Sequence, residues 1–372
     1  MSIIDGDIDR IYRNDITLVE YYFPSYENLT LSQMSFLLKA LKVNSTLQTL
    51  RMERNSLDLW CREEKKLLFE FLKANKTLRV LDLQGNNLGN CPETLKHLSE
   101  ALKVNKTLRR LRLDDNNLGN CPETLKHLSE ALKVNNALRE LDLSYNSENC
   151  NALSGMSSLL EALKMNNTLQ KLWLYGNHIG NHVEEMNSLL EALKVNKALQ
   201  MLDLRVNKLG DCPEGMRLLL EVLKVNKTLR ELDLRHNGLG DYPGHFRVKL
   251  LSESLKVNKT LQELDLGDNN LGNCPESIKF LSEALKVNKT LQVMGLGWNE
   301  LGICHAAVNS LLESLKVNGA IQKLWIHNND LDKTIENEIA NLVERNRHNN
   351  LLKSSCLFGL LLPILENYPL RV

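Results

Sequence analysis

The sequence has little of what a nucleic-acid-binding, membrane or secreted protein needs. Lys plus Arg and Asp plus Glu are both 46, so no excess positive charge is available to concentrate phosphates or anionic lipid. The longest apolar stretch, residues 357–365, contains a glycine and a proline and is far shorter than the roughly 18 residues of a membrane span. Residues 1–7 carry acidic side chains where a secretory signal has a basic and then an apolar run. We therefore expect a cytoplasmic protein that binds neither nucleic acid nor membrane.

Motifs that carry enzyme chemistry are also missing from the sequence. There is no phosphate-binding loop, no H-E-x-x-H and no nucleophile elbow, and the nine His residues are scattered rather than paired at ligand spacing. Asp203, Asp233 and Asp265 recur at one repeat position, but an open sheet offers little of the burial that raises the pKa of one acid in a catalytic pair. We expect no enzyme activity, no catalytic residues, no metal site and no cofactor.

The positive signal is a repeat. The pattern L-x-x-L-x-L-x-x-N-x-L occurs ten times, at spacings of 30, 31 or 32 residues. Its first residues are Leu47, Leu78, Leu108, Leu138, Leu169, Leu199, Leu229, Leu261, Leu291 and Ile321. The block from Asn86 to Asn105 recurs letter for letter from Asn116 to Asn135, which indicates duplication of a whole unit. A period of this length is typical of a solenoid of stacked units.

Each unit is predicted to hold one strand and one helix. In the second unit the alternation around Leu81 and Leu83 is typical of a short strand with one buried face. Asn86 follows at the turn, where its amide can bond the backbone of neighbouring turns and build a buried ladder. Pro92 suits the first position of the helix that comes next. One face of that helix carries Leu95, Leu98 and Leu102.

The units must stack because a single one cannot cover its leucine face. Helices need about 8–10 Å each and parallel strands about 4.8 Å, so the stack is expected to curve with the sheet inside. We predict an α/β solenoid, a horseshoe with an inner parallel sheet and outer helices. Residues 47–333 form its ten repeats, and residues 1–46 and 334–372 break the pattern and are expected to cap its ends.

Both predicted caps carry apolar residues that suit them to shield the core. Residues 18–23 resemble a degenerate strand, and residues 37–41 begin a helix that leads into the first repeat. The tail, residues 351–372, is apolar enough to seal the last repeat. Its residues 362–366, L-P-I-L-E, leave a short docking motif open as the alternative.

Units such as residues 229–240, L-R-E-L-D-L-R-H-N-G-L-G, resemble the ribonuclease-inhibitor-like subfamily of leucine-rich repeats. The resemblance covers residues 47–333. This subfamily is similar in architecture to the repeat domains of nucleotide-binding innate sensors and of the activating protein for the nuclear-transport GTPase. The resemblance implies a cytosolic α/β horseshoe that binds proteins.

Two columns of residues are predicted to face outward from the inner sheet, because strand residues alternate in direction. The middle column is Arg51, Asp82, Arg112, Asp142, Trp173, Asp203, Asp233, Asp265, Gly295 and Trp325. The next column is Glu53, Gln84, Asp114, Ser144, Tyr175, Arg205, Arg235, Gly267, Gly297 and His327. Between Arg51 and Asp142 the signs alternate, which predicts a neutralising ladder between strands. Arg205 and Arg235 are expected to temper the repulsion in the later Asp column.

Aromatic residues are the departure from the repeat consensus. We define the first aromatic cluster as Tyr145, Trp173 and Tyr175, and the second aromatic cluster as Trp298, Trp325 and His327. Exposed Trp and Tyr beside Arg are typical of an interface hot spot, so these six residues with Arg205 and Arg235 are the predicted partner-binding residues. The alternative is lateral packing of large side chains on the sheet. Trp60 is expected in the core.

Cysteines and sequons are predicted to echo the repeat rather than mark chemistry. No C-x-x-C pair occurs, and one column lies five residues after the repeat Asn: Cys91, Cys121, Cys212, Cys274 and Cys304. Column neighbours lie about a helix width apart, beyond the roughly 7 Å limit for a disulfide, so we expect free thiols that act as small apolar fillers.

The N-x-T sequons mark the repeated helix-to-strand corner, and modification there is not expected. Nine of the ten lysines near the helix ends follow a Glu by three residues, which predicts a self-neutralised outer face.

The leading hypothesis is a monomeric scaffold that binds an unidentified protein through its concave face. Regulation of a small GTPase is the first alternative, with Arg51 or Arg112 as the candidate arginine. The second is a sensing or effector repeat module of an innate-immune or host-interaction system.

Overall fold

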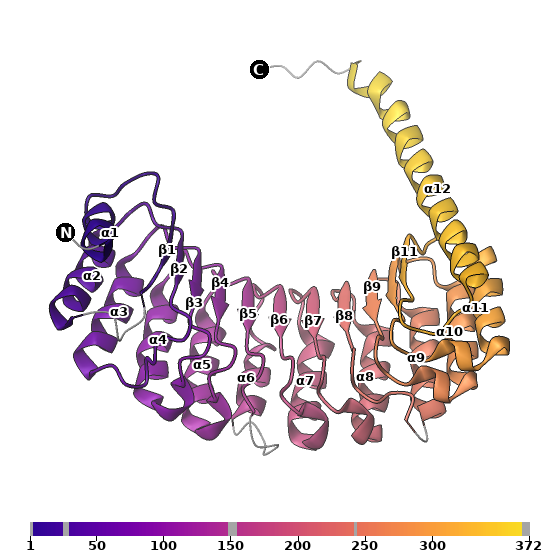
Figure 1. Ribbon diagram of the computed structural model, residues 1–372, viewed down its shortest axis with the longest axis horizontal. Helices are drawn as coiled ribbons and strands as arrows, with labels where there is room; N and C mark the ends of the chain where they lie inside the picture. The colour runs from indigo at the N-terminus through magenta and orange to yellow at the C-terminus, as the bar shows by residue number, and fades with distance from the viewer. Residues whose placement is uncertain (1–2, 25–29, 148–154, 242–243, 367–372) are drawn as a thin grey trace. The chain divides into compact units, whose positions relative to one another are not determined.

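The computed structural model describes residues 3–24, 30–147, 155–241 and 244–366. The chain forms two compact units, Met1–Leu218 and Leu219–Val372. Within each unit, three-residue strands alternate with helices, and the helices cover one face of the sheet while the other face is left open (Figure 1).

In the first unit each strand pairs in parallel with the next strand along the chain. The strands are β1 (Glu20–Tyr22), β2 (Thr49–Arg51), β3 (Val80–Asp82), β4 (Arg110–Arg112), β5 (Glu140–Asp142), β6 (Lys171–Trp173) and β7 (Met201–Asp203). The helices are α1 (Ile3–Tyr12), α2 (Leu31–Val43), α3 (Arg62–Ala74), α4 (Pro92–Val104), α5 (Pro122–Val134), α6 (Met156–Ala162) and α7 (Val183–Val195), and α8 (Pro213–Val225) spans the unit boundary. Single 3-10 turns precede several helices: η2 (Leu88–Asn90), η3 (Leu118–Asn120), η4 (Ile179–Asn181) and η5 (Leu209–Asp211).

The second unit repeats this arrangement, and its strands also pair in parallel in chain order. The strands are β8 (Glu231–Asp233), β9 (Glu263–Asp265), β10 (Val293–Gly295) and β11 (Lys323–Trp325). The helices and 3-10 turns are α9 (Gly244–Val257), η6 (Leu271–Asn273), α10 (Pro275–Val287), η7 (Leu301–Ile303), α11 (His305–Val317) and α12 (Lys333–Glu366). The predicted α/β solenoid of strand and helix units is confirmed.

The leucine pattern forms the core, as predicted. Leu81 on β3 and Leu83 directly after β3 are buried, and Leu95 and Leu98 are buried on the inner face of α4. Pro92 occupies the first turn of α4, where its missing N–H removes no helical hydrogen bond. The alternation of buried leucine and outward residue therefore decides which strand side chains reach the open face. Trp60 is buried, also as predicted.

A ladder of turn asparagines joins neighbouring repeats. The Asn86 side-chain oxygen accepts hydrogen bonds from the backbone N–H groups of Asn55 (2.8 Å) and Leu57 (3.3 Å), and its amide donates to the Met52 carbonyl at 2.8 Å. In the next repeat the Asn116 side-chain oxygen accepts a hydrogen bond from the Asn86 backbone N–H at 2.9 Å. The predicted ladder is confirmed, and it satisfies turn backbone groups that water cannot reach.

The sequon asparagines form a second ladder at the helix-to-strand corner. Asn75 follows α3, its oxygen accepts from the N–H groups of Thr77 and Leu78, and its amide donates to the Asn44 carbonyl at 3.1 Å. Asn105 donates to the Leu72 carbonyl at 2.7 Å. These amides are buried and bonded, so they are structural corner residues, as the repeat predicts.

The C-terminal cap differs from the expectation. Ile339 and Asn346 of α12 are buried, and the Asn346 amide donates to the carbonyls of Asn318 (2.8 Å) and Ile321 (3.0 Å), which extends the corner ladder by one step. Leu351 and Leu352, expected to seal the last repeat, are exposed because the first half of α12 already covers it. Residues 362–366 lie in the last turns of α12, where no side chain is described, and residues 367–372 lie outside the described residues.

At the N-terminus the predicted strand is confirmed, whereas α2 begins at Leu31, earlier than the predicted start at residue 37, and α1 was not predicted. Strand β1 falls within residues 18–23, and its Tyr21 is buried, as is Phe23 just beyond it. Helix α2 contains residues 37–41 and begins with a capping box between Thr30 and Gln33. On the outer surface, helix pairs such as Glu100–Lys103 (2.7 Å) and Glu283–Lys286 (2.7 Å) confirm the self-neutralised face.

The prediction that the column cysteines are apolar fillers is wrong for most of them. Cys212 is buried, whereas the other four are half-buried at the N-caps of their helices, where polar groups surround them. The Cys121 thiol donates to Glu123 at 3.3 Å and the Cys274 thiol to Glu276 at 3.6 Å. At Cys121 and Cys274 this cap position, at the margin of the core, brings the sulfur to the first carboxylate of the helix. The cysteines that the structure describes in this column are free thiols.

Candidate functional site

The open face of the sheet carries the predicted columns. On β6, Leu172 is buried in the core while Trp173 projects from the other face and stays partly exposed. The same alternation holds on β4, where Leu111 is buried and Arg112 is partly exposed. The open face of each unit can therefore be followed residue by residue.

Charges on the first strands form the predicted ladder. Arg51 Nε lies 2.6 Å from Glu20 Oε1, and Arg51 Nη1 lies 3.7 Å from Asp82 Oδ2. Arg112 Nη1 donates to the same Asp82 Oδ2 at 2.7 Å, and its Nε lies 3.9 Å from Asp142 Oδ2. The alternation of sign runs from β1 to β5, so this part of the face is a structural network.

Asp114 is the member of that network whose negative charge is poorly stabilised. Arg112 Nη2 lies 3.1 Å from Asp114 Oδ2 and also donates to Gln84 Oε1 at 3.2 Å. Burial, together with the nearby Asp142 carboxylate, nevertheless raises the pKa of Asp114 to about 6. The desolvation of the Asp114 carboxylate thus destabilises its charged form more than the ion pair with Arg112 stabilises it.

The first aromatic cluster brings two rings into contact. The centroids of Tyr145 and Tyr175 lie 4.4 Å apart with planes tilted by 58°. The Tyr145 N–H donates to the Tyr175 carbonyl at 2.7 Å, which fixes the turn after β5 against the turn after β6. Burial and the hydrogen bond with Tyr175 raise the pKa of Tyr145 to about 12. Tyr145 remains 47% exposed, so the pair presents ring surface to solvent.

Arginines stack on this cluster. The Arg205 guanidinium lies 4.7 Å from the Tyr175 ring centroid, while its Nε donates to both carboxylate oxygens of Asp203 at 3.0 and 2.9 Å. The Arg110 guanidinium lies 5.5 Å from the Trp173 centroid. Arg205 was predicted here, and Arg110 was missed. Arg110 lies on β4, one strand before Asp142 and two strands before Trp173. The contact between Arg110 and Trp173 therefore spans three repeats and cannot be recognised from the sequence of one repeat.

A groove of about 520 Å³ lies beside Tyr145, at the turns that follow the strands of the first unit. It is lined by Arg54, Gln84, Asp115, Tyr145, Ser147, Gly176, His178 and Val206. Burial, with the nearby Lys208 and His182, lowers the pKa of His178. Sequence reasoning missed this groove, although one signal existed: Arg54, Asp115, Tyr145 and Val206 all stand at one turn position and share a left-handed backbone.

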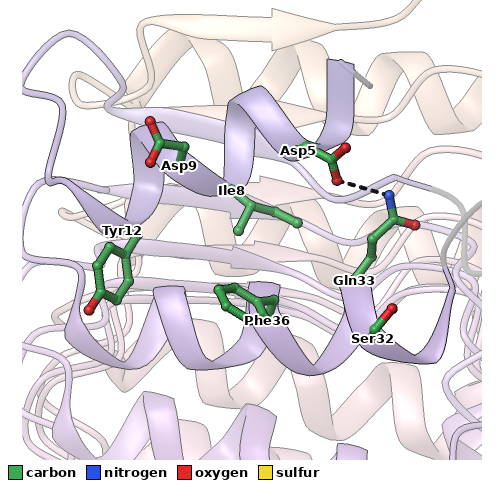
Figure 2. Close-up of a pocket in the computed structure, with 7 residues that line it drawn as sticks. All are labelled: Asp5, Ile8, Asp9, Tyr12, Ser32, Gln33 and Phe36. Carbon is green, nitrogen blue, oxygen red and sulfur yellow. Dashed lines mark hydrogen bonds between the residues drawn. The ribbon is translucent and has the colours of Figure 1, made fainter. Parts of the chain in front are cut away.

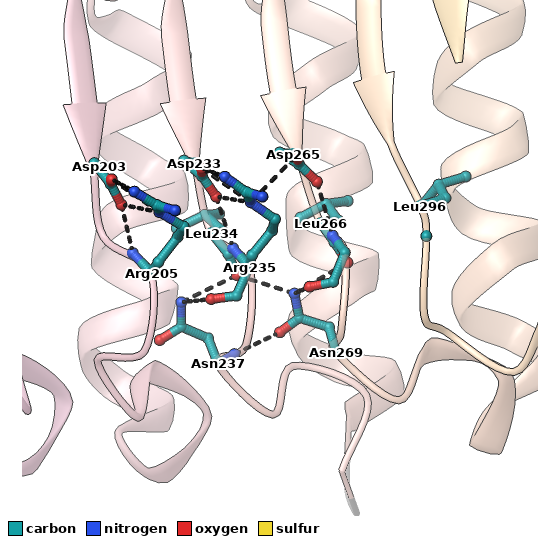
Figure 3. A network of polar contacts seen from close by, with 12 residues as sticks. Asp203, Arg205, Asp233, Leu234, Arg235, Asn237, Asp265, Leu266, Asn269 and Leu296 are labelled. Atoms are coloured by element: carbon teal, nitrogen blue, oxygen red, sulfur yellow. Dashed lines mark hydrogen bonds and ion pairs between the residues drawn. The ribbon is translucent and has the colours of Figure 1, made fainter. Parts of the chain in front are cut away.

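In the second unit Arg235 forms ion pairs with two aspartates, Asp233 and Asp265. Its Nε donates to Asp233 Oδ1 and Oδ2, each at 3.0 Å, and lies 3.3 Å from Asp265 Oδ2 (Figure 3). Gly295 on the next strand makes room for Asp265, because a Cβ at residue 295 would fall 2.0 Å from Asp265 Oδ1. The predicted tempering of the aspartate column is confirmed, and Gly295 is part of the same arrangement.

The second aromatic cluster is more open. Trp298 is 59% exposed at a left-handed turn position, and its N–H donates to the His327 carbonyl at 3.0 Å. The Lys323 ammonium lies 4.6 Å from the Trp325 ring centroid. The His327 ring lies over Gly297, where a Cβ would fall 2.9 Å from it. Trp298 and His327 thus meet through the backbone of neighbouring turns, and Lys323, which contacts Trp325, is an addition to the prediction.

Acidic residues accompany this second cluster. Glu231 and Glu263 are register partners on β8 and β9, next to the partners Asp233 and Asp265. Burial, Glu231 and Asp265 raise the pKa of Glu263. The open face of the second unit is therefore acidic around Arg235, whereas arginines flank the first aromatic cluster.

A further hollow of about 360 Å³ lies between α1 and α2 (Figure 2). The side chains of Ile8, Tyr12 and Phe36 line it, and Tyr12 and Phe36 are exposed. Its carboxylates are engaged, since Asp5 accepts from Gln33 Nε2 at 3.1 Å and Asp9 from Arg13 Nε at 2.8 Å. Sequence reasoning missed this hollow as well.

Among the described residues, no group of three or more His, Cys, Asp or Glu side chains could hold a metal ion. Within the same residues, no helix combines the length and the apolar character that crossing a membrane requires.

Comparison with known proteins supports the fold. The family profile described as "Leucine Rich repeat" matches residues 74–90, 225–241 and 257–273. The leucine-rich repeat-containing protein LegL7 from Legionella pneumophila is similar in structure, with a TM-score of 0.60 at 19% identity over 88% of this chain and 98% of that chain. No curated protein matches the chain significantly.

Two more distant solved structures complete the comparison. The actin-binding site 2 of leiomodin-1 aligns with a TM-score of 0.35 at 16% identity, over 56% of this chain and 98% of that one. A TLR13–ssRNA13 complex aligns with a TM-score of 0.43 at 18% identity, over 77% of this chain and 40% of that one. The chain carries leucine-rich repeats and has the leucine-rich-repeat fold, and these matches add nothing about its ligand.

Proposed function

We propose that this chain is a cytoplasmic, monomeric protein-recognition scaffold of the ribonuclease-inhibitor-like kind, which binds one protein partner through the open face of its sheet. Leucine-rich repeats generally mediate protein–protein interaction. The repeat length of 30 to 32 residues, with a full helix in most units, supports the subfamily.

The observation that best supports this proposal is the contact between the rings of Tyr145 and Tyr175, with the Arg205 guanidinium stacked on Tyr175. Tyrosine and arginine dominate interface hot spots because they combine large area with few rotatable bonds and a polar tip. Here Asp203 holds Arg205 and the two rings hold each other, so little side-chain entropy remains to be lost on binding. The groove beside Tyr145 gives a partner side chain room to insert.

No observation favours the small-GTPase alternative. Arg112 is engaged by Asp82, Asp114 and Gln84, and Arg51 by Glu20. An arginine that stabilises a transferring phosphoryl group must be free to reach it. Both candidate arginines instead hold the charge ladder together.

The test is affinity capture from native cytosol with immobilised wild-type chain, a Tyr145→Ala/Tyr175→Ala variant and a Trp298→Ala/Trp325→Ala variant. Lys103→Ala, on the outer face of α4, is the matched control. Proteins that the wild type and the control retain should be lost from the first variant and reduced on the second. Thermal melts of all four proteins should agree. Equal retention by the folded variants would overturn the proposal.

A further inference from the structure

Lys65 occupies a core position of helix α3. The repeats that follow place buried leucines, Leu95 and Leu125, at the equivalent point of α4 and α5. Lys65 is only 6% exposed, and its ammonium donates to the Asp58 carbonyl at 2.9 Å and to the Cys91 sulfur at 3.2 Å. A lysine buried among leucines carries a desolvation cost, so this contact calls for an explanation.

Cys91 meets donors from its own helix as well. It is the N-cap of α4, where backbone N–H groups favour negative charge. The Thr94 hydroxyl faces its sulfur, is fully buried, and has no oxygen or nitrogen partner at hydrogen-bonding distance among the described residues. Burial raises the pKa of the Cys91 thiol, but hydrogen bonds from Thr94 and Lys65 outweigh burial and bring the pKa below its usual value.

Other charges near the sulfur are engaged elsewhere. Glu93 pairs with Arg62 of α3 at 3.5 Å, and Glu64 accepts the Cys61 N–H at 2.8 Å. No acidic partner of the Cys91 sulfur occurs among the described contacts. Lys65 is therefore the charge that decides the state of this thiol.

The chain contains a matched comparison. Cys121 lies in an identical block of twenty residues, from Asn116 to Asn135, with Leu95 in place of Lys65 on the preceding helix. Its thiol donates to Glu123, and the Thr124 hydroxyl is satisfied by the carbonyls of Leu118 (2.8 Å) and Cys121 (2.6 Å). The same sequence thus places a sulfur that donates to a carboxylate at Cys121 and a sulfur that accepts from an ammonium at Cys91.

We propose that Cys91 is a modification site at which a thiolate, held by Lys65 and Thr94, reacts with small electrophiles such as hydrogen peroxide. The sulfur attacks one peroxide oxygen, so the S–O bond forms while the O–O bond breaks and two electrons pass from sulfur to peroxide. The leaving hydroxide takes a proton from the Lys65 ammonium and departs as water. Cys91 is left as a sulfenic acid, and Lys65 regains its proton from solvent.

The test measures alkylation of the full chain by iodoacetamide at pH 7. Trypsin releases Cys91 and Cys121 in different peptides, residues 80–96 and 113–126, so one mass-spectrometric time course gives both rates. Cys91 should react faster than Cys121, because its lowered pKa raises the thiolate fraction at pH 7 and the thiolate is the nucleophile. Equal rates in the wild type would overturn the proposal without recourse to any variant.

Two variants assign the effect. Lys65→Leu should lower the Cys91 rate to that of Cys121, whereas Lys66→Leu, which removes an exposed lysine next in sequence, should leave it unchanged. Equal losses in both variants would contradict a contact effect. Peroxide followed by dimedone should label Cys91 in the wild type and not in Lys65→Leu. Absence of the label from wild-type Cys91 would refute the peroxide reaction.

Discussion

The ring of Tyr145 lies over Gly176, where a Cβ would fall 2.7 Å from Tyr145 Cδ1. Gly176 also has φ +69°, a left-handed conformation that residues with a side chain rarely adopt. A glycine in the turn after β6 therefore decides how the ring of the preceding turn lies. Through Tyr145 it shapes the groove and the contact with Tyr175.

Gly176→Ala is expected to lower the free energy of unfolding by about 1–3 kcal/mol, because the backbone strain and the clash with Tyr145 add. Urea denaturation measures this. Gly319→Ala is the control, since a Cβ there meets nothing within 4 Å, and it should stay near the wild type. Equal stability of the two variants would contradict the packing of Tyr145 on Gly176.

Asn116→Ala should cost roughly 2–4 kcal/mol, because it leaves buried backbone groups without partners. The Asn116 amide donates to the Leu83 carbonyl at 2.8 Å, and its oxygen accepts from the N–H groups of Asn86 and Leu88. Asn120→Ala, in the same repeat, removes one exposed hydrogen bond at 3.3 Å and should be nearly silent. Chemical denaturation of both variants compares them directly, and a silent Asn116→Ala would mean that the ladder does not stabilise the fold.

Asp114 makes stability depend on pH. Its folded pKa of about 6 exceeds the ordinary 3.8, so the folded state binds more protons between these values and stability falls as pH rises from 4 to 6. The shift of about two units corresponds to at most roughly 3 kcal/mol. Asp114→Asn should remove this loss, so its stability relative to the wild type should rise across that window. A constant difference between the two proteins from pH 4 to 7 would contradict the raised pKa.

Lys65→Leu should raise the free energy of unfolding by about 1 kcal/mol or more, since leucine fills the same core position without a buried charge. Differential scanning calorimetry would show a higher Tm. A lower Tm would mean that the bonds from Lys65 to the Asp58 carbonyl and Cys91 outweigh its desolvation.

The repeat determined most of what could be predicted. Leu81, Leu83 and Asn86 each recur at a fixed place, so their burial and bonds follow from periodicity and backbone satisfaction alone. The charge ladder followed from the 4.8 Å spacing of strands, which places Asp82 within reach of Arg112.

Contacts that depend on departures from the repeat were not predictable in the same way. Lys65 reaches Cys91 only because one unit has lysine where the others have leucine, methionine, isoleucine or valine, and the two residues belong to different repeats. Arg110 reaches Trp173 across an intervening strand, which depends on side-chain rotamers rather than on spacing. The cap on the last repeat is made by Asn346, whose place in the ladder is hidden inside a continuous helix.

We propose that one protein partner contacts the open face of the sheet at both aromatic clusters. A photoreactive p-benzoylphenylalanine at residue 145 or 298, followed by irradiation in native cytosol, tests it most directly. Residue 195, an exposed valine at the end of α7 on the helix side, is the matched control position. We expect residues 145 and 298 to cross-link to the same protein and residue 195 not to cross-link to it. Cross-links at residue 195 alone would contradict it.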